Sequence, residues 1–297
     1  MTDSIIFSII IPHKNIPGLL QRCIDSIPVR NDIQIIVVDD NSNPEIVDFD
    51  NFPGNNNSCV EIYLTKDGKG AGYARNIGLS HAKGKWILFA DADDFFTEHA
   101  FETFYSYNDD ITDIIYFNTL TVDSDTLEIL PNRLCGLEKW IRNKDINGLK
   151  YRSTVPWGKM INRSFIQNNN ITFHELPVAN DIWFSCQVGY NAKNIQISSV
   201  RAYCSTVRKG SLYNIMTKER REIRFREALN VNNFLYSHKL RKYRVEPLDY
   251  YWPKLYKPFD LLSLDLLISY IKQEKGWIFY YIPRYICSKL SKIIPIK

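Results

Sequence analysis

Three carboxylates stand close together in the segment FADADDF, residues 89–95. They follow WILFA, residues 86–90, a short apolar run typical of a strand buried on both faces. In open α/β sheets, ligands bind beyond the carboxyl ends of such strands. Carboxylate oxygens there suit Mg²⁺ or Mn²⁺, which would neutralise the phosphates of a leaving nucleotide. The position after a strand, rather than the acidity alone, makes Asp91, Asp93 and Asp94 a candidate metal and phosphate site.

A second acidic pair, Asp39 and Asp40, ends the strand-like run IQIIVV at residues 33–38 and is followed by Asn41 and Ser42. The pair falls on the same expected edge of the sheet. A carboxylate there can accept hydrogen bonds from a nucleobase or a ribose, as the acidic residue of dinucleotide folds does. Asp, Asn and Ser also favour turns and helix N-caps, so a structural role for the pair stays open.

Residues 68–76, GKGAGYARN, combine three glycines with Lys69 and Arg75 directly before an expected helix. Backbone amides and cations in such a segment can approach a phosphate. The glycine spacing fits neither a Walker loop nor the pattern G-x-G-x-x-G. Binding of an anion and a plain flexible loop are therefore both open.

Apolar runs and helical patterns alternate along the chain. Strands are expected at residues 5–11, 33–38, 60–64, 86–90, 114–120 and 195–207. Helices are expected to begin at Pro17 and after an N-cap at Thr97, and to cover residues 73–82, 163–169 and 181–189. This alternation predicts an α/β fold with an open, mostly parallel sheet and helices on both faces.

The same patterns suggest how the chain is divided. We expect one domain over residues 1–215, made of a nucleotide-binding half, 1–125, and an acceptor-side half, 126–215. From residue 216 onward, charged helix-forming residues alternate with aromatic and aliphatic ones, which predicts a helical extension over 216–297.

Composition indicates a globular protein, with 45% hydrophobic residues among 297. The six cysteines form no CxxC pair, so we expect reduced packing residues rather than a zinc site or a disulfide framework. The N-terminus lacks the pattern of a signal peptide, which gives a cytoplasmic location as the expectation. A net charge of +4 is too small to indicate binding to nucleic acid by itself.

The end of the chain mixes cations with aromatic residues, in KERREIRFR at residues 218–226 and again over residues 276–297. Pro283 and Arg284 interrupt the last apolar run, so it falls short of the ~18 to 20 apolar residues that span a bilayer. Three alternatives stay open for this tail. It is a peripheral contact with the inner face of the cell membrane, a segment packed on its own domain, or a contact in a homodimer.

Four motifs within the first part of the chain, in this order, resemble those of the family 2 glycosyltransferases. They are P-x-x-N at 12–15, DD-x-S at 39–42, ARN-x-G at 74–78 and D-x-DD at 91–94. The resemblance implies a GT-A fold. Many relatives carry Asn at the position of Gly68, so this chain departs from the pattern at its glycine loop.

The resemblance also implies a role for each carboxylate of the donor site. Asp40 would hold the base, Asp91 the ribose, and Asp93, alone or with Asp94, the metal ion Mn²⁺ or Mg²⁺. The segment VRKGSL, residues 207–212, is similar to the family segment that closes over the donor diphosphate. The other donor-site residues that the resemblance implies are Pro12, Lys14, Asn15, Arg75, Arg208, Lys209 and Ser211.

For the acceptor, PWGKMINRSFI at residues 156–166 is similar to the family segment that precedes the acceptor site. The family then carries an acidic pair whose Asp is the general base. Here the pair is Asn180 and Asp181, so the Asp is retained and its neighbour differs. A helix-capping role for Asp181 is the alternative from the residues alone.

The hypothesis from the sequence is an inverting transfer of a sugar from a nucleotide-diphosphate donor, a UDP-sugar by preference. The acceptor would be a hydroxyl of a glycan or a lipid-linked saccharide in the synthesis of surface polysaccharide. A nucleotidyltransferase is a second hypothesis, although residues 12–18 lack its glycine-rich loop. A non-catalytic scaffold at the membrane is the third.

Overall fold

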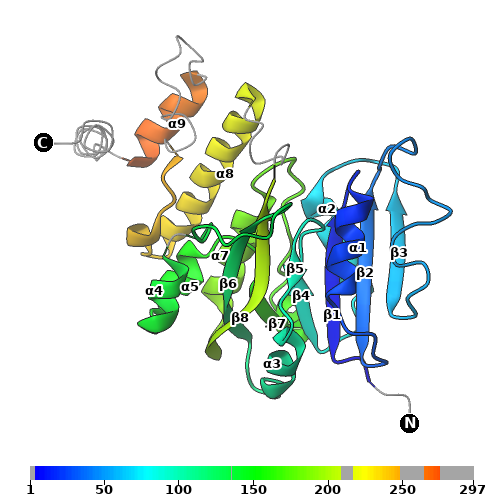
Figure 1. Ribbon diagram of the computed structural model, residues 1–297. Helices are drawn as coiled ribbons and strands as arrows, with labels where there is room; N and C mark the ends of the chain where they lie inside the picture. The colour runs from blue at the N-terminus through cyan, green and yellow to red at the C-terminus, as the bar shows by residue number, and fades with distance from the viewer. Residues whose placement is uncertain (1–3, 135, 209–216, 248–263, 275–297) are drawn as a thin grey trace, which may run out of the picture. The chain divides into compact units, whose positions relative to one another are not determined.

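The computed structural model describes residues 4–134, 136–208, 217–247 and 264–274 (Figure 1). The chain divides into two compact units, Met1–Ile215 and Met216–Lys297. As functional domains these two ranges, and the further division at residue 125, stay predictions.

One mixed sheet of eight strands forms the centre of the first unit, in the order β3-β2-β1-β4-β7-β6-β8-β5 (Figure 1). The strands are β1 (Phe7–His13), β2 (Ile33–Asp40), β3 (Val60–Thr65), β4 (Trp86–Phe89), β5 (Phe95–Phe96), β6 (Ile114–Asp123), β7 (Lys159–Asn162) and β8 (Ile195–Val207). The first four strands in this order are parallel to one another, and β8 is parallel to β6. β7 and β5 run antiparallel to their neighbours, so the mostly parallel sheet is confirmed with two reversed strands.

Helices cover both faces of the sheet, as predicted (Figure 1). They are α1 (Pro17–Asp25), α2 (Ala71–His81), α3 (Ala100–Ser106), α4 (Leu137–Arg142), α5 (Ile146–Arg152), α6 (Arg163–Asn168) and α7 (Asn180–Asn191). Phe7, Ile9 and Ile11 of β1 pack in one apolar cluster with α1 and α3. Ile10 points the other way, into a second cluster with α2 and α7. β1 is apolar throughout because both of its faces are buried.

The strand register brings the predicted polar residues to one edge of the sheet. His13 at the end of β1 pairs with Asp39 near the end of β2. β4 runs parallel to β1 and ends at Phe89, two residues before Asp91. The carboxyl ends of β1, β2 and β4 therefore meet, as the sequence pattern required.

Local details confirm some expectations and correct another. Pro17 occupies the first turn of α1, where its missing N–H costs nothing. Thr97 is not the N-cap of the next helix, because α3 begins at Ala100 after His99. The Thr97 hydroxyl instead donates to the carbonyl of Arg201, at 2.7 Å, beside the pairing of β5 with β8. The four described cysteines, Cys23, Cys59, Cys186 and Cys204, are buried, as expected of packing residues.

The second unit is helical where it is described, with α8 (Lys218–Ser237), a short 3-10 helix η1 (Arg241–Tyr243) and α9 (Leu264–Glu274). Its apolar contact is formed by Phe225 and Leu229 of α8 with Leu266 and Tyr270 of α9. The expected contact of residues 276–297 with a membrane or a second copy lies outside the described residues.

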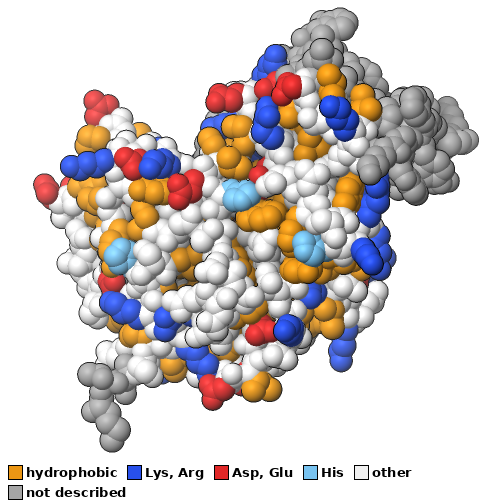
Figure 2. Space-filling model, turned by 180° about the vertical axis from the view of Figure 1, so that it is seen from behind, with side chains coloured by type: hydrophobic (Ala, Val, Ile, Leu, Met, Phe, Trp, Pro, Cys, Tyr) orange, Lys and Arg blue, Asp and Glu red, His pale blue; other side chains and the backbone are white. Residues whose placement is uncertain are grey.

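The described surface gives no large patch of one charge on the face shown in Figure 2, where basic side chains are interspersed with acidic and apolar ones. Among the described residues, none of the helices combines the length and the apolar character needed to cross a membrane.

Helix α2 lies unusually close to its neighbours because two of its residues are glycines. A Cβ at Gly72 would stand 2.3 Å from the carbonyl oxygen of His174 and 2.8 Å from Cβ of Asn180. A Cβ at Gly78 would stand 2.4 Å from Cγ2 of Ile10. The missing side chains let α2 sit directly on β1 and on the segment that leads into α7.

We expect Gly72→Ala to reduce the free energy of unfolding by about 1–3 kcal/mol, because the added methyl group meets backbone atoms. Urea unfolding followed by circular dichroism measures the loss. Gly18→Ala is the matched control, since a Cβ at Gly18 in α1 meets nothing within 4 Å. Equal stability of the two variants would contradict this account of α2.

Candidate functional site

Arg75 of α2 joins two elements at the carboxyl edge of the sheet. Its Nη2 donates to Oδ1 of Asp91 at 2.6 Å, and its Nη1 donates to Oδ1 of Asn180 at 2.9 Å. The residue is only 5% exposed, and its guanidinium stands 5.4 Å from the ring centre of Phe173. Protein groups therefore bind both Nη atoms, and the contact of Arg75 with a nucleotide stays a prediction.

Asn180, the departure from the family pattern, fits this place. Its Oδ1 accepts from Arg75, and its Nδ2 donates to the carbonyl of Leu176 at 3.1 Å. A carboxylate could accept from Arg75 but could not donate to Leu176. The preceding residue, Ala179, is the N-cap of α7 and has a left-handed conformation with φ of 60°. The two hydrogen bonds of the Asn180 side-chain amide, to Arg75 and to Leu176, thus fix the strained start of α7.

Asp181 is the second residue of α7 and partly exposed. The N-cap is Ala179, so Asp181 does not cap this helix, and the capping alternative is wrong. A carboxylate in the first turn is favoured by the positive end of the helix dipole. Asp181 directly follows Asn180 in the sequence. Arg75 binds both Asn180 and Asp91 and so links the start of α7 to the acidic loop.

Asp94 anchors the acidic loop to β8. Its Oδ2 accepts from the Tyr203 hydroxyl at 2.8 Å, and its Oδ1 accepts from the backbone N–H of Thr206 at 2.7 Å. Burial, and next the negative charges of Asp91 and Asp93, raise the pKa of the Asp94 carboxyl well above its usual value. Both oxygens are bound inside the protein and the residue is 1% exposed, so the prediction of Asp94 as a metal ligand does not fit the structure.

Asp93 differs from Asp94, because the protein binds its backbone carbonyl while its carboxylate is partly exposed. Its carbonyl oxygen accepts from Arg22 at 2.7 Å and from the Thr206 hydroxyl at 2.8 Å. Its Oδ2 pairs with Nε of Arg208 at 3.0 Å, and the two side chains are 21% and 23% exposed. The structure thus brings a predicted metal ligand and a predicted phosphate contact together.

The donor groups fit a divalent cation that shares its coordination with a substrate. Asp93 and the 33% exposed side chain of Asp91 offer hard oxygen ligands. In the described part of the chain, no group of three or more His, Cys, Asp or Glu side chains is arranged to hold a metal ion. Mg²⁺ is commonly held by one or two carboxylates together with substrate phosphates and water, which matches this arrangement. Lys209 and Ser211 lie outside the described residues.

Asp40 provides a buried acceptor at the end of β2. Its Oδ2 accepts from the backbone N–H of Gly70 at 2.9 Å and pairs with Nζ of Lys14 at 3.5 Å. Its Oδ1 is buried and, among the described residues, has no hydrogen-bond partner. An unsatisfied buried acceptor costs about 1–3 kcal/mol, so a ligand N–H placed at Oδ1 would recover that free energy.

Asp39 performs the structural role that the sequence left open for the acidic pair. Its Oδ1 accepts from the backbone N–H of Ser42 at 2.8 Å, and its Oδ2 accepts from the Ser42 hydroxyl at 2.6 Å. Oδ2 also lies 2.7 Å from Nδ1 of His13, while Nε2 of His13 accepts from the N–H of Ile16 at 3.1 Å. His13, a residue to which the sequence gave no role, thus links Asp39 of β2 to the start of α1.

Pro12 and Asn15 also take part in the contacts that join the ends of β1 and β2. Pro12 pairs with Val38 across the two strands. The Asn15 backbone N–H donates to the Ser42 hydroxyl at 2.8 Å, and its Oδ1 accepts from the N–H of Asn43 at 2.7 Å. Asn15 has a φ of 58°, so these two hydrogen bonds hold a residue in the left-handed conformation directly after β1.

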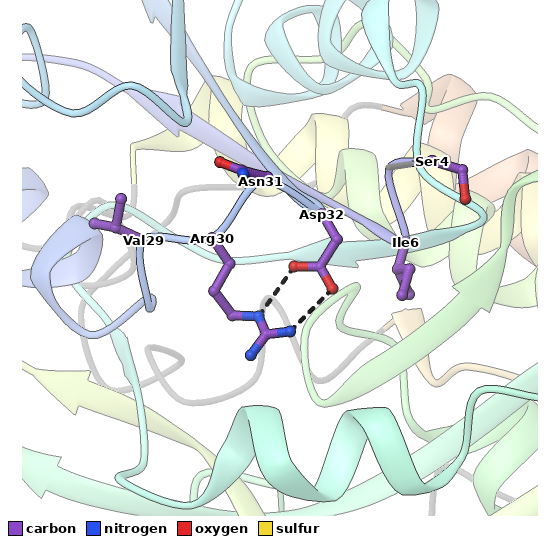
Figure 3. Close-up of a pocket in the computed structure, with 6 residues that line it drawn as sticks. All are labelled: Ser4, Ile6, Val29, Arg30, Asn31 and Asp32. Carbon is purple, nitrogen blue, oxygen red and sulfur yellow. Dashed lines mark hydrogen bonds and ion pairs between the residues drawn. The ribbon is translucent and has the colours of Figure 1, made fainter. Parts of the chain in front are cut away.

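A surface hollow elsewhere is a poor candidate for chemistry (Figure 3). It is lined by Ser4, Ile6, Val29, Arg30, Asn31 and Asp32. These residues precede β1 and β2, so the hollow lies at the amino ends of the strands, away from Asp40 and Asp91. Its charged groups, Arg30 and Asp32, pair with each other at 3.0 Å.

The chain matches the model of glycosyl transferase family 2 over residues 8–169. The chain belongs to this family. The match includes Asp40 and the segment 91–94 but ends before Asp181. The family membership predicted from the four sequence motifs is confirmed.

Among its relatives is the poly(ribitol-phosphate) beta-glucosyltransferase of Bacillus spizizenii, 28% identical over 68% of this chain. This chain spans only 32% of the length of that protein. The cholesterol galactosyltransferase of Borreliella burgdorferi is 25% identical over 82% of this chain and 76% of its own length.

The fold is similar to that of the solved S. aureus TarS fragment 1–349 in complex with UDP-GlcNAc. The TM-score is 0.65 at 19% identity, over 92% of this chain and 81% of the fragment. At this identity the similarity concerns the fold. The predicted GT-A architecture of this family 2 member is confirmed.

We expect Tyr203→Phe to destabilise the protein by about 1–3 kcal/mol, because the lost hydroxyl donates to buried Asp94 and accepts from the N–H of Asp91 at 2.9 Å. Urea unfolding measures the change. Tyr105→Phe is the control, since its hydroxyl donates to the carboxylate of Asp32 beside the exposed Arg30, away from the acidic loop. If both variants lost the same stability, the Tyr203 hydroxyl would not be the anchor of the acidic loop.

Proposed function

We propose that this protein is an inverting glycosyltransferase that moves a sugar from a UDP-sugar to a hydroxyl of a glycan or lipid-linked saccharide in surface polysaccharide synthesis. One observation carries the proposal. The buried Arg75 guanidinium links Asp91, beyond β4, to the first residue of α7, beside Asp181. Donor-side and acceptor-side carboxylates are thereby held at one edge of the sheet, as transfer between two bound substrates requires.

The unsatisfied oxygen of Asp40 favours a uridine donor. A carboxylate only accepts hydrogen bonds, so it suits the ring N–H of uracil. Cytosine presents an acceptor at the same ring position and would leave Oδ1 of Asp40 unpaired. The names of the relatives, which include glucosyl and galactosyl transfer, support a hexose or an N-acetylhexosamine as the sugar.

Asp93 would hold Mn²⁺ or Mg²⁺ beside the diphosphate, with Arg208 at its carboxylate as a second positive group. When bound, the cation neutralises negative charge that develops on the leaving diphosphate. Asp91, oriented by Arg75, would accept a hydrogen bond from a ribose hydroxyl. Asp94 and Tyr203 keep the loop that carries these carboxylates in place.

Asp181 would act as the general base. It takes the proton of the acceptor hydroxyl while the acceptor oxygen bonds to the anomeric carbon, and the bond from that carbon to the diphosphate breaks. Attack from the face opposite the leaving group inverts the configuration. The proton ends on Asp181, and the electron pair of the broken bond ends on the diphosphate.

The donor is tested by thermal shift with UDP and CDP, each with and without Mn²⁺. We expect UDP with Mn²⁺ to raise the melting temperature, corresponding to about 2.7 kcal/mol at a ligand concentration of 100 Kd, and CDP to raise it far less. In Asp93→Asn the part of the shift that depends on Mn²⁺ should disappear.

Asp110→Asn is the matched control for charge, because the Asp110 side chain is 94% exposed and lies outside the site. Its shift with UDP and Mn²⁺ should equal that of the wild type. An unchanged Mn²⁺-dependent shift in Asp93→Asn would contradict the metal assignment, and equal shifts with UDP and CDP would contradict the role of Asp40.

For the base, we expect Asp181→Asn to slow the release of UDP from a UDP-sugar by about 10²- to 10⁴-fold, because the proton acceptor is lost. Calorimetry should give an unchanged affinity for UDP. A scaffold without activity would show binding of UDP and no turnover even in the wild type. Full turnover in Asp181→Asn would remove this residue from the mechanism.

A further inference from the structure

Lys159 is a buried cationic side chain in the middle of the sheet, on β7 between β4 and β6. The residue is 3% exposed. Its Nζ donates to the carbonyls of Ser153 and Val155, at 2.7 and 2.6 Å, and to the hydroxyl of Ser185 at 3.3 Å. The amine therefore ties the segment before β7 to helix α7. A buried amine is costly unless it has partners, and here three acceptors match its three donors.

The same amine interacts electrostatically with Asp181. Ser185 comes four residues after Asp181 on α7, so both side chains lie on one face of the helix. The negative charge of Asp181 favours the protonated form of Lys159. From β6, the Tyr116 ring lies 5.7 Å from Nζ, and burial raises the pKa of that phenol, which keeps it neutral. Among the described groups, Asp181 is thus the charged residue that acts on this amine.

The environment of Lys159 accommodates both protonation states. Burial lowers the pKa of the amine to about 7, against the opposing effect of Asp181. As an ammonium it donates to all three acceptors, and the Ser185 hydroxyl donates in turn to the carbonyl of Thr154 at 2.9 Å. As a neutral amine it can still donate to two carbonyls and accept from Ser185. Its charge can therefore change without breaking the link to α7.

We propose that Lys159 is a positioning residue for Asp181: its amine holds the first half of α7 in place and, when protonated, stabilises the ionised Asp181 carboxylate. The proposal rests on the proposed function insofar as Asp181 is the base. The electrostatic link itself does not depend on that role. The two parts are therefore tested by separate measurements.

The link is tested by urea unfolding of the wild type, Lys159→Met, Asp181→Asn and the double variant, at pH 6 and pH 9. At pH 6 we expect Lys159→Met to lower the urea midpoint more when Asp181 is present than in the Asp181→Asn background. At pH 9 the difference should shrink, because the buried amine is then neutral. Additive effects at both pH values would overturn the proposal.

The sign of the pH dependence gives a second check on the same samples. Above about pH 7 the folded protein has released the Lys159 proton, while the unfolded chain still binds it up to the ordinary pKa of lysine. Stability therefore rises with pH through this window in the wild type. The rise should be missing in Lys159→Met, and an equal rise in both proteins would contradict the assigned titration.

The functional part is tested by slow hydrolysis of UDP-glucose, UDP-galactose and UDP-N-acetylglucosamine with Mn²⁺ between pH 4.5 and pH 8.5. Loss of a nearby cation disfavours the ionised form of a carboxyl group. The acidic limb of the pH–rate profile, where the rate falls as the base is protonated, should therefore move up by roughly one pH unit in Lys159→Met. Ser185→Ala is the control, since it removes a hydrogen-bond acceptor of the amine and keeps the charge. Its acidic limb should stay in place.

A lower rate in Lys159→Met with an unmoved acidic limb would assign the lysine a merely structural role and overturn the proposal. Should the wild type bind and hydrolyse none of the three UDP-sugars, the proposed function fails, while the unfolding cycle still decides whether Lys159 and Asp181 are coupled.

Discussion

The hydrogen bonds of one buried guanidinium organise this site. Arg75 takes its position from α2, which lies close to its neighbours because Gly72 and Gly78 leave room for them. From there it binds Asp91 beyond β4 and Asn180 at the start of α7. A planar group with several donors in fixed directions can hold two acceptors at once, which a lysine cannot do with the same geometry. The relation between the two carboxylate-bearing segments depends on this contact.

Of the acidic residues around this contact, some bind protein groups and others keep oxygens available for a ligand. Asp94 and Asp39 are buried, accept bonds from protein donors and fix the loops after β4 and β2. Their sequence neighbours, Asp93 and Asp40, keep an oxygen or a partly exposed carboxylate for a ligand. Each acidic pair thus has one member whose oxygens are bound by the protein to hold the loop, and one with an oxygen left for the proposed ligand.

On the acceptor side, α7 is held at two points along its length. The Asn180 amide fixes the first residue of α7 to Arg75 and Leu176, and five residues later Ser185 accepts from the buried amine of Lys159. Asp181 lies between these two attachments. A general base must be positioned to within tenths of an ångström, so support on both sides is what the role proposed for Asp181 would require.

The sequence alone determined the fold class, since apolar runs of strand length alternate with helical periods, and it determined which strand ends carry carboxylates. It could not reveal β5 and β7, because two and four residues are too short for a periodic pattern. It also could not separate Asp93 from Asp94, because adjacent residues of one type differ only in where the folded backbone points them. Tertiary structure alone decided that Arg75 meets Asn180, 105 residues away, and that Lys159 is buried beneath α7.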